Sequence, residues 1–187
     1  MSQLYFIEKN FMFRRFTKDH DRQIKGDEIL KPFINLDEIK EFSSREKGKY
    51  GESCAGISEK IGAKKLGYSI SIVPPGKRVC PFHNHHINEE MFLILEGSGT
   101  LRFGSEEYSI KKHDIIACPP GDRHVAHQII NTSDKPLRYL CLSTKDPYDI
   151  CEYPDSDKIL SYCHHENTKF GHVGYLKDKA DYYEGEL

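Results

Sequence analysis

Three histidines and one glutamate near the middle of the chain have the residue types and spacing of ligands for a metal ion. His83 and His85 are separated by one residue, so on a strand both side chains point to the same face and Asn84 points to the other. Glu90 follows after a turn at residues 86–89, at the start of the next apolar run. Two imidazoles beside a carboxylate make a mixed nitrogen and oxygen site that suits several divalent metals.

A downstream histidine is expected to supply the fourth ligand, and two histidines compete for that role. A turn at residues 119–121 is followed by the run HVAHQIIN, which contains both of them. His124 lies three residues after Gly121, and His127 lies four residues before Asn131. Because they are three residues apart, they would face opposite sides of a strand, so only one of them is expected to bind.

The segments that carry these residues are predicted to be short β-strands. Across residues 66–144, β-type runs such as LGYSISIV and EEMFLILE alternate with turn residues at close, regular spacing. No stretch of helical periodicity interrupts the series, and the pattern occurs in a single copy. The sequence therefore predicts an all-β sandwich or barrel with one barrel in the chain. In EEMFLILE, we expect Glu90, Phe92 and Ile94 to face the interior.

The flanking segments have weaker patterns. Residues 1–35 are interpreted as an N-terminal arm, residues 36–145 as the barrel, and residues 146–187 as a C-terminal appendage that packs on the barrel or on a partner subunit. Within the second of these ranges, the charged, glycine-bearing residues 41–53 are expected to form a loop.

Composition restricts the function classes. The 187 residues are 37% hydrophobic and 30% charged, which fits one globular domain with a proper core. A formal net charge of −2 gives no reason to expect nucleic acid or a membrane surface as a partner. We expect a cytoplasmic protein, because the N-terminal residues lack the unbroken apolar stretch of a signal peptide. The six cysteines have no CxxC pair and are expected to be reduced thiols.

The two histidine-bearing segments resemble the two sequence motifs of the cupin superfamily. The first motif, a glycine, an HxH, a glutamate and a glycine, is met by Gly76, His83, His85, Glu90 and Gly97. The second motif is met by Asp114, Pro119, Gly121 and Asn131, but His113 stands where the family has glycine, and the segment after Gly121 is a few residues longer than usual. His124 keeps the family spacing from the turn, whereas His127 keeps the spacing to Asn131. We favour His127, because an insertion is better tolerated in a turn than in a packed strand.

The resemblance extends over residues 34–187 to bacterial single-barrel cupins, and more loosely to the cupin type of phosphomannose isomerase. It implies a double-stranded β-helix, or jelly-roll, barrel that holds one divalent metal ion, which could be Zn, Mn, Fe, Ni or Cu. The expected ligands are His83, His85, Glu90 and His127, and we expect Glu90 and His127 to take part in catalysis.

Several functions remain open at this point, because one fold supports many chemistries. The first is a metal-dependent enzyme, of isomerase or dioxygenase type, that acts on a small polar molecule in the barrel. The second is a non-catalytic barrel that binds or senses a small ligand, and a structural or storage barrel is a weaker third. A barrel that keeps the histidines as polar pocket lining without a metal is a further alternative. We expect a homodimer, because such barrels have edge strands that a second copy can cover.

Overall fold

The computed structural model describes residues 31–165 and 168–186, and most of their regular structure is β-strand. The strands are β1 (Ser43–Lys47), β2 (Tyr50–Gly56), β3 (Leu66–Val73), β4 (Asn84–His85), β5 (Glu90–Glu96), β6 (Ser98–Phe103), β7 (Glu106–Lys111), β8 (Ile115–Cys118), β9 (His127–Ile130), β10 (Leu137–Thr144), β11 (Tyr148–Tyr153), β12 (Lys158–His165) and β13 (Thr168–Tyr175). Three short 3-10 helices join them: η1 (Leu36–Glu38), η2 (Ser58–Ile61) and η3 (Arg123–Val125). Among these residues, no helix has the length and apolar character needed to cross a bilayer.

Antiparallel pairing joins the strands into three sheets. The largest has the order β1-β2-β3-β10-β5-β8, the second has the order β7-β6-β9, and the third has the order β13-β12-β11-β4. The all-β jelly-roll barrel predicted from the sequence is confirmed.

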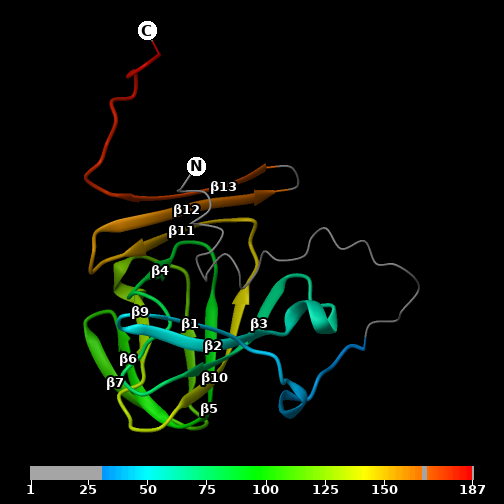
Figure 1. The fold of residues 1–187 in the computed structure, drawn as a ribbon. Helices are drawn as coiled ribbons and strands as arrows, with labels where there is room; N and C mark the ends of the chain where they lie inside the picture. Colours follow the sequence, from blue (N-terminus) through cyan, green and yellow to red (C-terminus); the bar gives the residue numbers. More distant parts are fainter. Residues whose placement is uncertain (1–30, 166–167, 187) are drawn as a thin grey trace.

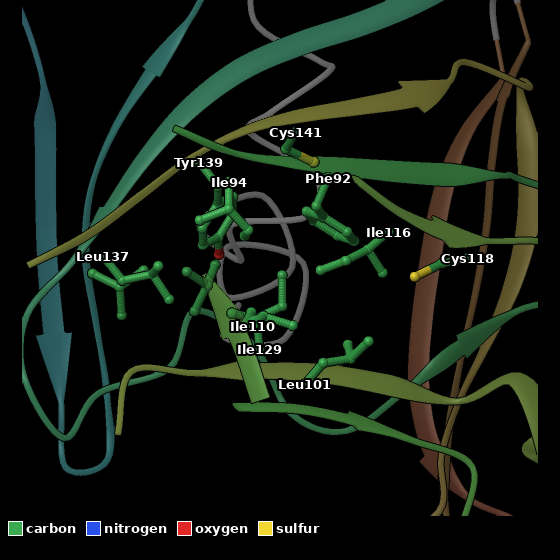
Figure 2. Packing of buried hydrophobic residues seen from close by; sticks show 12 residues of the cluster. Phe92, Ile94, Leu101, Ile110, Ile116, Cys118, Ile129, Leu137, Tyr139 and Cys141 are labelled. Atoms are coloured by element: carbon green, nitrogen blue, oxygen red, sulfur yellow. The ribbon is translucent and has the colours of Figure 1, made fainter. Parts of the chain in front are cut away.

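The barrel interior is apolar over most of its length. Strand β5 shows the predicted alternation, with Phe92 and Ile94 buried and Met91 and Leu93 only half-buried. Figure 2 shows side chains from several strands pointing toward one another inside the barrel. The members of this cluster are Val73, Val79, Phe92, Ile94, Leu101, Ile110, Ile116, Cys118, Ile129, Leu137, Tyr139 and Cys141.

The C-terminal strands form a layer across one end of the barrel (Figure 1). Strand β11 pairs with the two-residue strand β4, so that Cys151 lies opposite His85 and Glu152 lies opposite Asn84. Cys151 and Leu160 are buried on the inner face of this layer. The third sheet therefore joins the tail of the chain directly to the segment that carries the HxH pair.

One expectation for the N-terminal part of the barrel was wrong. Residues 41–53, predicted to be a loop, form most of the β1–β2 hairpin, in which Lys47 lies opposite Tyr50 across a turn that contains Gly48. Every residue of β1 is exposed, so the strand has no alternation of apolar and polar residues to reveal it. The division at residues 35 and 145 stays a prediction, and residues 1–30 of the expected arm lie outside the described residues.

Two turn positions explain the glycines of the motifs. Gly97 has φ of 82°, and a Cβ atom there would lie 2.6 Å from the carbonyl oxygen of Pro136, so only glycine fits. His113 stands where the family has glycine, and it too has a positive φ, of 79°. A side chain in this left-handed region costs about 1 kcal/mol. His113 therefore keeps the conformation of the turn, and it adds this conformational strain locally.

Candidate metal centre

Glu90 begins β5 and faces three imidazole rings in the buried interior of the barrel end. Its Oε2 atom lies 3.2 Å from Nε2 of His127, 3.5 Å from Nε2 of His85 and 3.7 Å from Nε2 of His83. All four side chains are buried. The structure thus brings together the four residues that the sequence nominated.

Backbone hydrogen bonds hold the two motifs against each other. His83 and His127 exchange a pair of backbone bonds, of 3.2 and 2.7 Å. The backbone N–H of Gly121 donates to the carbonyl oxygen of His85 at 2.8 Å, and the side-chain amide of Asn84 donates to the carbonyl oxygen of Gly121 at 2.8 Å. The turn of the second motif therefore fixes the HxH segment of the first, so both segments are needed to form the cluster.

In two of the rings, the nitrogen that points away from Glu90 faces a backbone carbonyl oxygen. Nδ1 of His83 lies 2.9 Å from the carbonyl oxygen of Pro81, and Nδ1 of His127 lies 3.2 Å from the carbonyl oxygen of Val125. A carbonyl oxygen can only accept, so the ring nitrogen that faces it carries the proton. In the neutral ring, the Nε2 lone pair then points inward, which is the form that binds a metal.

The third ring has a charged acceptor. Nδ1 of His85 lies 2.5 Å from Oδ2 of Asp149, which comes from β11 in the C-terminal sheet. Cys151 of the same strand places its Sγ 3.4 Å from this nitrogen. His85 therefore also presents Nε2 to the interior, so all three rings direct Nε2 toward Glu90.

The donor set fits a divalent metal. The Nε2 atoms of His83 and His85 are buried and have no hydrogen-bond partner within residues 31–165 and 168–186. Buried polar atoms are normally paired, because leaving one without a partner costs free energy. Donor atoms of His83, Glu90 and His127 all lie within 4.8 Å of one another, so they could hold one ion. Three imidazoles and a carboxylate suit Zn, Mn, Fe, Ni or Cu, without selecting among them.

The charges of the four groups are coupled. Burial by itself raises the pKa of Glu90, but the adjacent imidazoles of His127, His83 and His85 hold that pKa well below its ordinary value. Burial and the nearby charge of His83 lower the pKa of His127. Burial also disfavours protonation of His83, yet Cys80 and Glu90 raise its pKa to about 10. Glu90 is thus a buried anion balanced by imidazole protons, and a metal ion would take their place.

The two neighbouring histidines lie away from this cluster. His124 is exposed in η3, where its backbone N–H donates to the side chain of Asp122 at 2.9 Å. The extra residues after Gly121 therefore form a 3-10 turn, as the preference for His127 assumed. His86 is exposed, and its Nε2 lies 2.8 Å from Oε1 of Glu152.

Sequence reasoning missed the groups that surround the four residues. Asp149 and Cys151 come from the tail, and the ring of Tyr153 stacks 6.3 Å from that of His83. Cys141 places its Sγ 3.8 Å from Oε1 of Glu90. No local motif marks these residues, because they reach the site only through strand pairing across long sequence separations.

The comparison with known families decides what this arrangement is. Residues 69–143 match the family described as the cupin domain, and this range contains all four clustered residues. The chain therefore contains a cupin domain. The matched range also contains the two segments that resemble the cupin motifs.

Curated relatives match this cupin over part of their length. A protein of Methanocaldococcus jannaschii, described as uncharacterized, is 38% identical over 79 residues, which cover 42% of this chain and 60% of the relative. Auxin-binding protein 1 of Arabidopsis thaliana is 31% identical over 103 residues, half of each chain. The matches thus span less than two thirds of these relatives.

Two solved structures share the fold over most of the cupin. One, from Acidithiobacillus ferrooxidans, is described as a candidate sugar phosphate isomerase; it has a TM-score of 0.72 and 22% identity, and the match covers 81% of this chain and 96% of that one. The other, a sugar phosphate isomerase of the cupin superfamily from Silicibacter pomeroyi, has a TM-score of 0.67 and 21% identity, with 82% and 98% covered. At this identity, the likeness shows a common fold.

Proposed function

We propose that this cupin binds one divalent metal ion through His83, His85, Glu90 and His127, and that it is a metal-dependent enzyme acting on a small polar molecule. The observation that carries the proposal is the convergence of three inward Nε2 atoms on one buried carboxylate oxygen. Such a set is costly to bury unless a cation is bound.

The chain's own groups have distinct tasks in this proposal. When bound, the ion would polarise a carbonyl or hydroxyl oxygen or bind dioxygen. Glu90 is ionised and supplies the negative charge of the site, because its pKa is held low. His127 favours its neutral form. Their facing donor atoms, 3.2 Å apart, would both be taken up by the ion, so their part in catalysis would be to hold the ion and set its charge.

Sugar phosphates are the first substrate class to test, because both matched structures carry that description. An isomerase should convert a sugar phosphate without oxygen after loading with Zn or Mn. A dioxygenase should consume oxygen on an organic acid or other oxidisable substrate only after loading with Fe(II). Running the same substrates with and without oxygen separates the two reaction types.

A second candidate is a non-catalytic receptor for a small ligand, which the match to auxin-binding protein 1 favours. A receptor loaded with metal should gain thermal stability from its ligand by mass action and leave the ligand chemically unchanged. Recovery of unaltered ligand after prolonged incubation, together with a raised melting temperature, would select this function over the enzyme.

Metal analysis tests the proposal most directly. Protein purified without chelator should contain one divalent ion per chain, and His127→Ala should remove most of it. His124→Ala is the matched control, because that histidine is exposed in η3 and should leave the metal content unchanged. A wild-type protein that takes up no metal on reconstitution would overturn the proposal. We also expect a homodimer, which sedimentation analysis would reveal.

A further inference from the structure

His85 differs from the other two rings of the cluster in what lies behind it. Nδ1 of His83 and of His127 meets a backbone carbonyl oxygen two residues away in the chain. Nδ1 of His85 meets the Asp149 carboxylate, 64 residues away in sequence, at 2.5 Å. A charged acceptor polarises an imidazole more strongly than a carbonyl does, and it makes the opposite nitrogen a better metal ligand.

The Asp149 carboxylate is held in place by donors on both oxygens. Oδ1 accepts from the backbone N–H groups of Ile87, at 3.0 Å, and Ile150, at 2.8 Å. Oδ2 accepts from Asn88 Nδ2 at 3.0 Å, in addition to His85. Hydrogen bonds to both oxygens favour the ionised form of a carboxylate, because that form only accepts. The acceptor behind His85 is thus a fixed, buried anion.

Asn88 is itself locked by the surrounding elements. Its Nδ2 donates to the hydroxyl of Tyr162 at 2.8 Å, and its Oδ1 accepts from Thr144 Oγ1 at 2.8 Å and from the backbone N–H of Asp146 at 2.9 Å. The network therefore runs from β12 and the end of β10, through Asn88 and Asp149, to His85. Because each member is hydrogen-bonded, the orientation of the ring is determined by the C-terminal sheet.

We propose that Asp149 is a positioning residue of the metal centre, so that the C-terminal sheet is a working part of the site. This inference rests on the proposed function, because it requires that His85 bind a metal through Nε2. Asp149 orients the ring, fixes the proton on Nδ1 and strengthens the Nε2–metal bond, without touching the ion.

A competing use of the same atoms is a second metal site. His85, Asp149 and Cys151 also bring donor atoms within 4.8 Å of one another. However, nitrogen and oxygen ligands lie about 2.0–2.2 Å from a zinc ion at tetrahedral angles, which separates the two donors by more than 3 Å. The observed 2.5 Å between Nδ1 and Oδ2 is a hydrogen bond, and the two atoms leave no room for an ion between them.

Metal affinity and stoichiometry test the inference in the full-length chain. Titration calorimetry with Zn²⁺ should give one ion per chain for wild type and for Asp149→Asn, with a Kd about 10–100-fold weaker in the variant. The visible spectrum of bound Co²⁺ should also shift in the variant, which a merely structural role would not cause. Glu152→Gln removes a carboxylate from the same strand that touches none of the four ligands, and it should change neither readout.

The outcomes separate the two proposals. If wild type binds no ion, the proposed function fails and takes this inference with it. If wild type binds one ion and Asp149→Asn binds equally tightly with an unchanged spectrum, the inference alone fails. Two ions in wild type and one in Asp149→Asn would establish the second metal site instead.

One measurement needs no variant and covers the case in which Asp149→Asn does not fold. In Zn-loaded wild type, nitrogen-15 NMR should show metal bound at Nε2 of His85 and a proton retained on Nδ1. That proton should resonate downfield of the corresponding protons of His83 and His127, because its acceptor is charged. Coordination of His85 through Nδ1 would overturn the inference.

Discussion

Two glutamates are buried among the residues that the structure describes, in two different regions, and they are balanced in opposite ways. Glu52, on β2, is 2% exposed and lies directly opposite Arg45 of β1, whose Nε donates to Oε1 at 3.0 Å. Ser71 donates to its other oxygen at 2.9 Å. Glu90 is 5% exposed, and its ion pairs among the described residues are with histidines.

The difference shows how a buried carboxylate becomes a site. Arginine keeps its charge at any ordinary pH, so the cation that balances Glu52 is a permanent part of the chain. Imidazoles can give up their protons, so the charge around Glu90 can be exchanged for that of a metal ion. We therefore expect the first carboxylate to contribute to stability and the second to metal binding.

Removing the charge of Glu90 should have the largest effect. Glu90→Gln deletes the anionic ligand, so the affinity for a divalent ion should fall by more than about 100-fold, since even outer residues contribute about 10–100-fold. Calorimetric titration of the apo-protein measures this. If Glu90→Gln binds metal at wild-type affinity, Glu90 does not differ from Glu52 in the way described.

The matched change at the other carboxylate should alter stability and leave metal binding intact. Glu52→Gln takes the charged acceptor from Arg45, whose side chain is 37% exposed and so keeps part of its hydration. We expect a loss of about 1–3 kcal/mol in the free energy of unfolding. Urea denaturation measures the loss. A weakened metal affinity in this variant would contradict the assignment of Glu52 to stability alone.

A third carboxylate, Glu152, extends the comparison toward the surface. It accepts from Arg123 Nε at 2.7 Å and pairs with His86 at 2.8 Å. Burial raises its pKa, but Arg123 and His86 outweigh this effect and lower it. Glu152→Gln should therefore cost only about 0.5 kcal/mol at neutral pH.

The pH dependence of that small cost has a definite sign. A carboxyl whose pKa is lower in the folded state stabilises the protein above its unfolded pKa of about 4.3, and the contribution is lost as the pH falls through the folded pKa. The unfolding curves of wild type and Glu152→Gln should therefore converge in acid. A gap that widens toward low pH would contradict this assignment.

Local pattern predicted the barrel and its four clustered residues well, because both depend on short-range spacing. Strand β5 alternates over seven residues, and the HxH pair shares one face by strand geometry alone. The choice between His124 and His127 needed the structure, since only the 3-10 turn of η3 shows where the inserted residues go.

The remaining features could not be predicted, because no short-range pattern encodes them. Strand β1 is exposed along its whole length, so it carries no apolar alternation. Asp149 reaches His85 across 64 residues through the pairing of β11 with β4. A contact of that kind depends on the register of two strands, which spacing within either segment does not reveal.

The pairing of β4 with β11 has a consequence for the order in which the protein is made. All four clustered residues leave the ribosome before β11, which supplies both the partner strand of β4 and the carboxylate behind His85. Because synthesis proceeds from the N-terminus at about 5–20 residues per second, the nascent barrel exists for seconds with its histidines present and one ring unsupported. A tightly held ion should therefore be acquired late, once translation has passed residue 153.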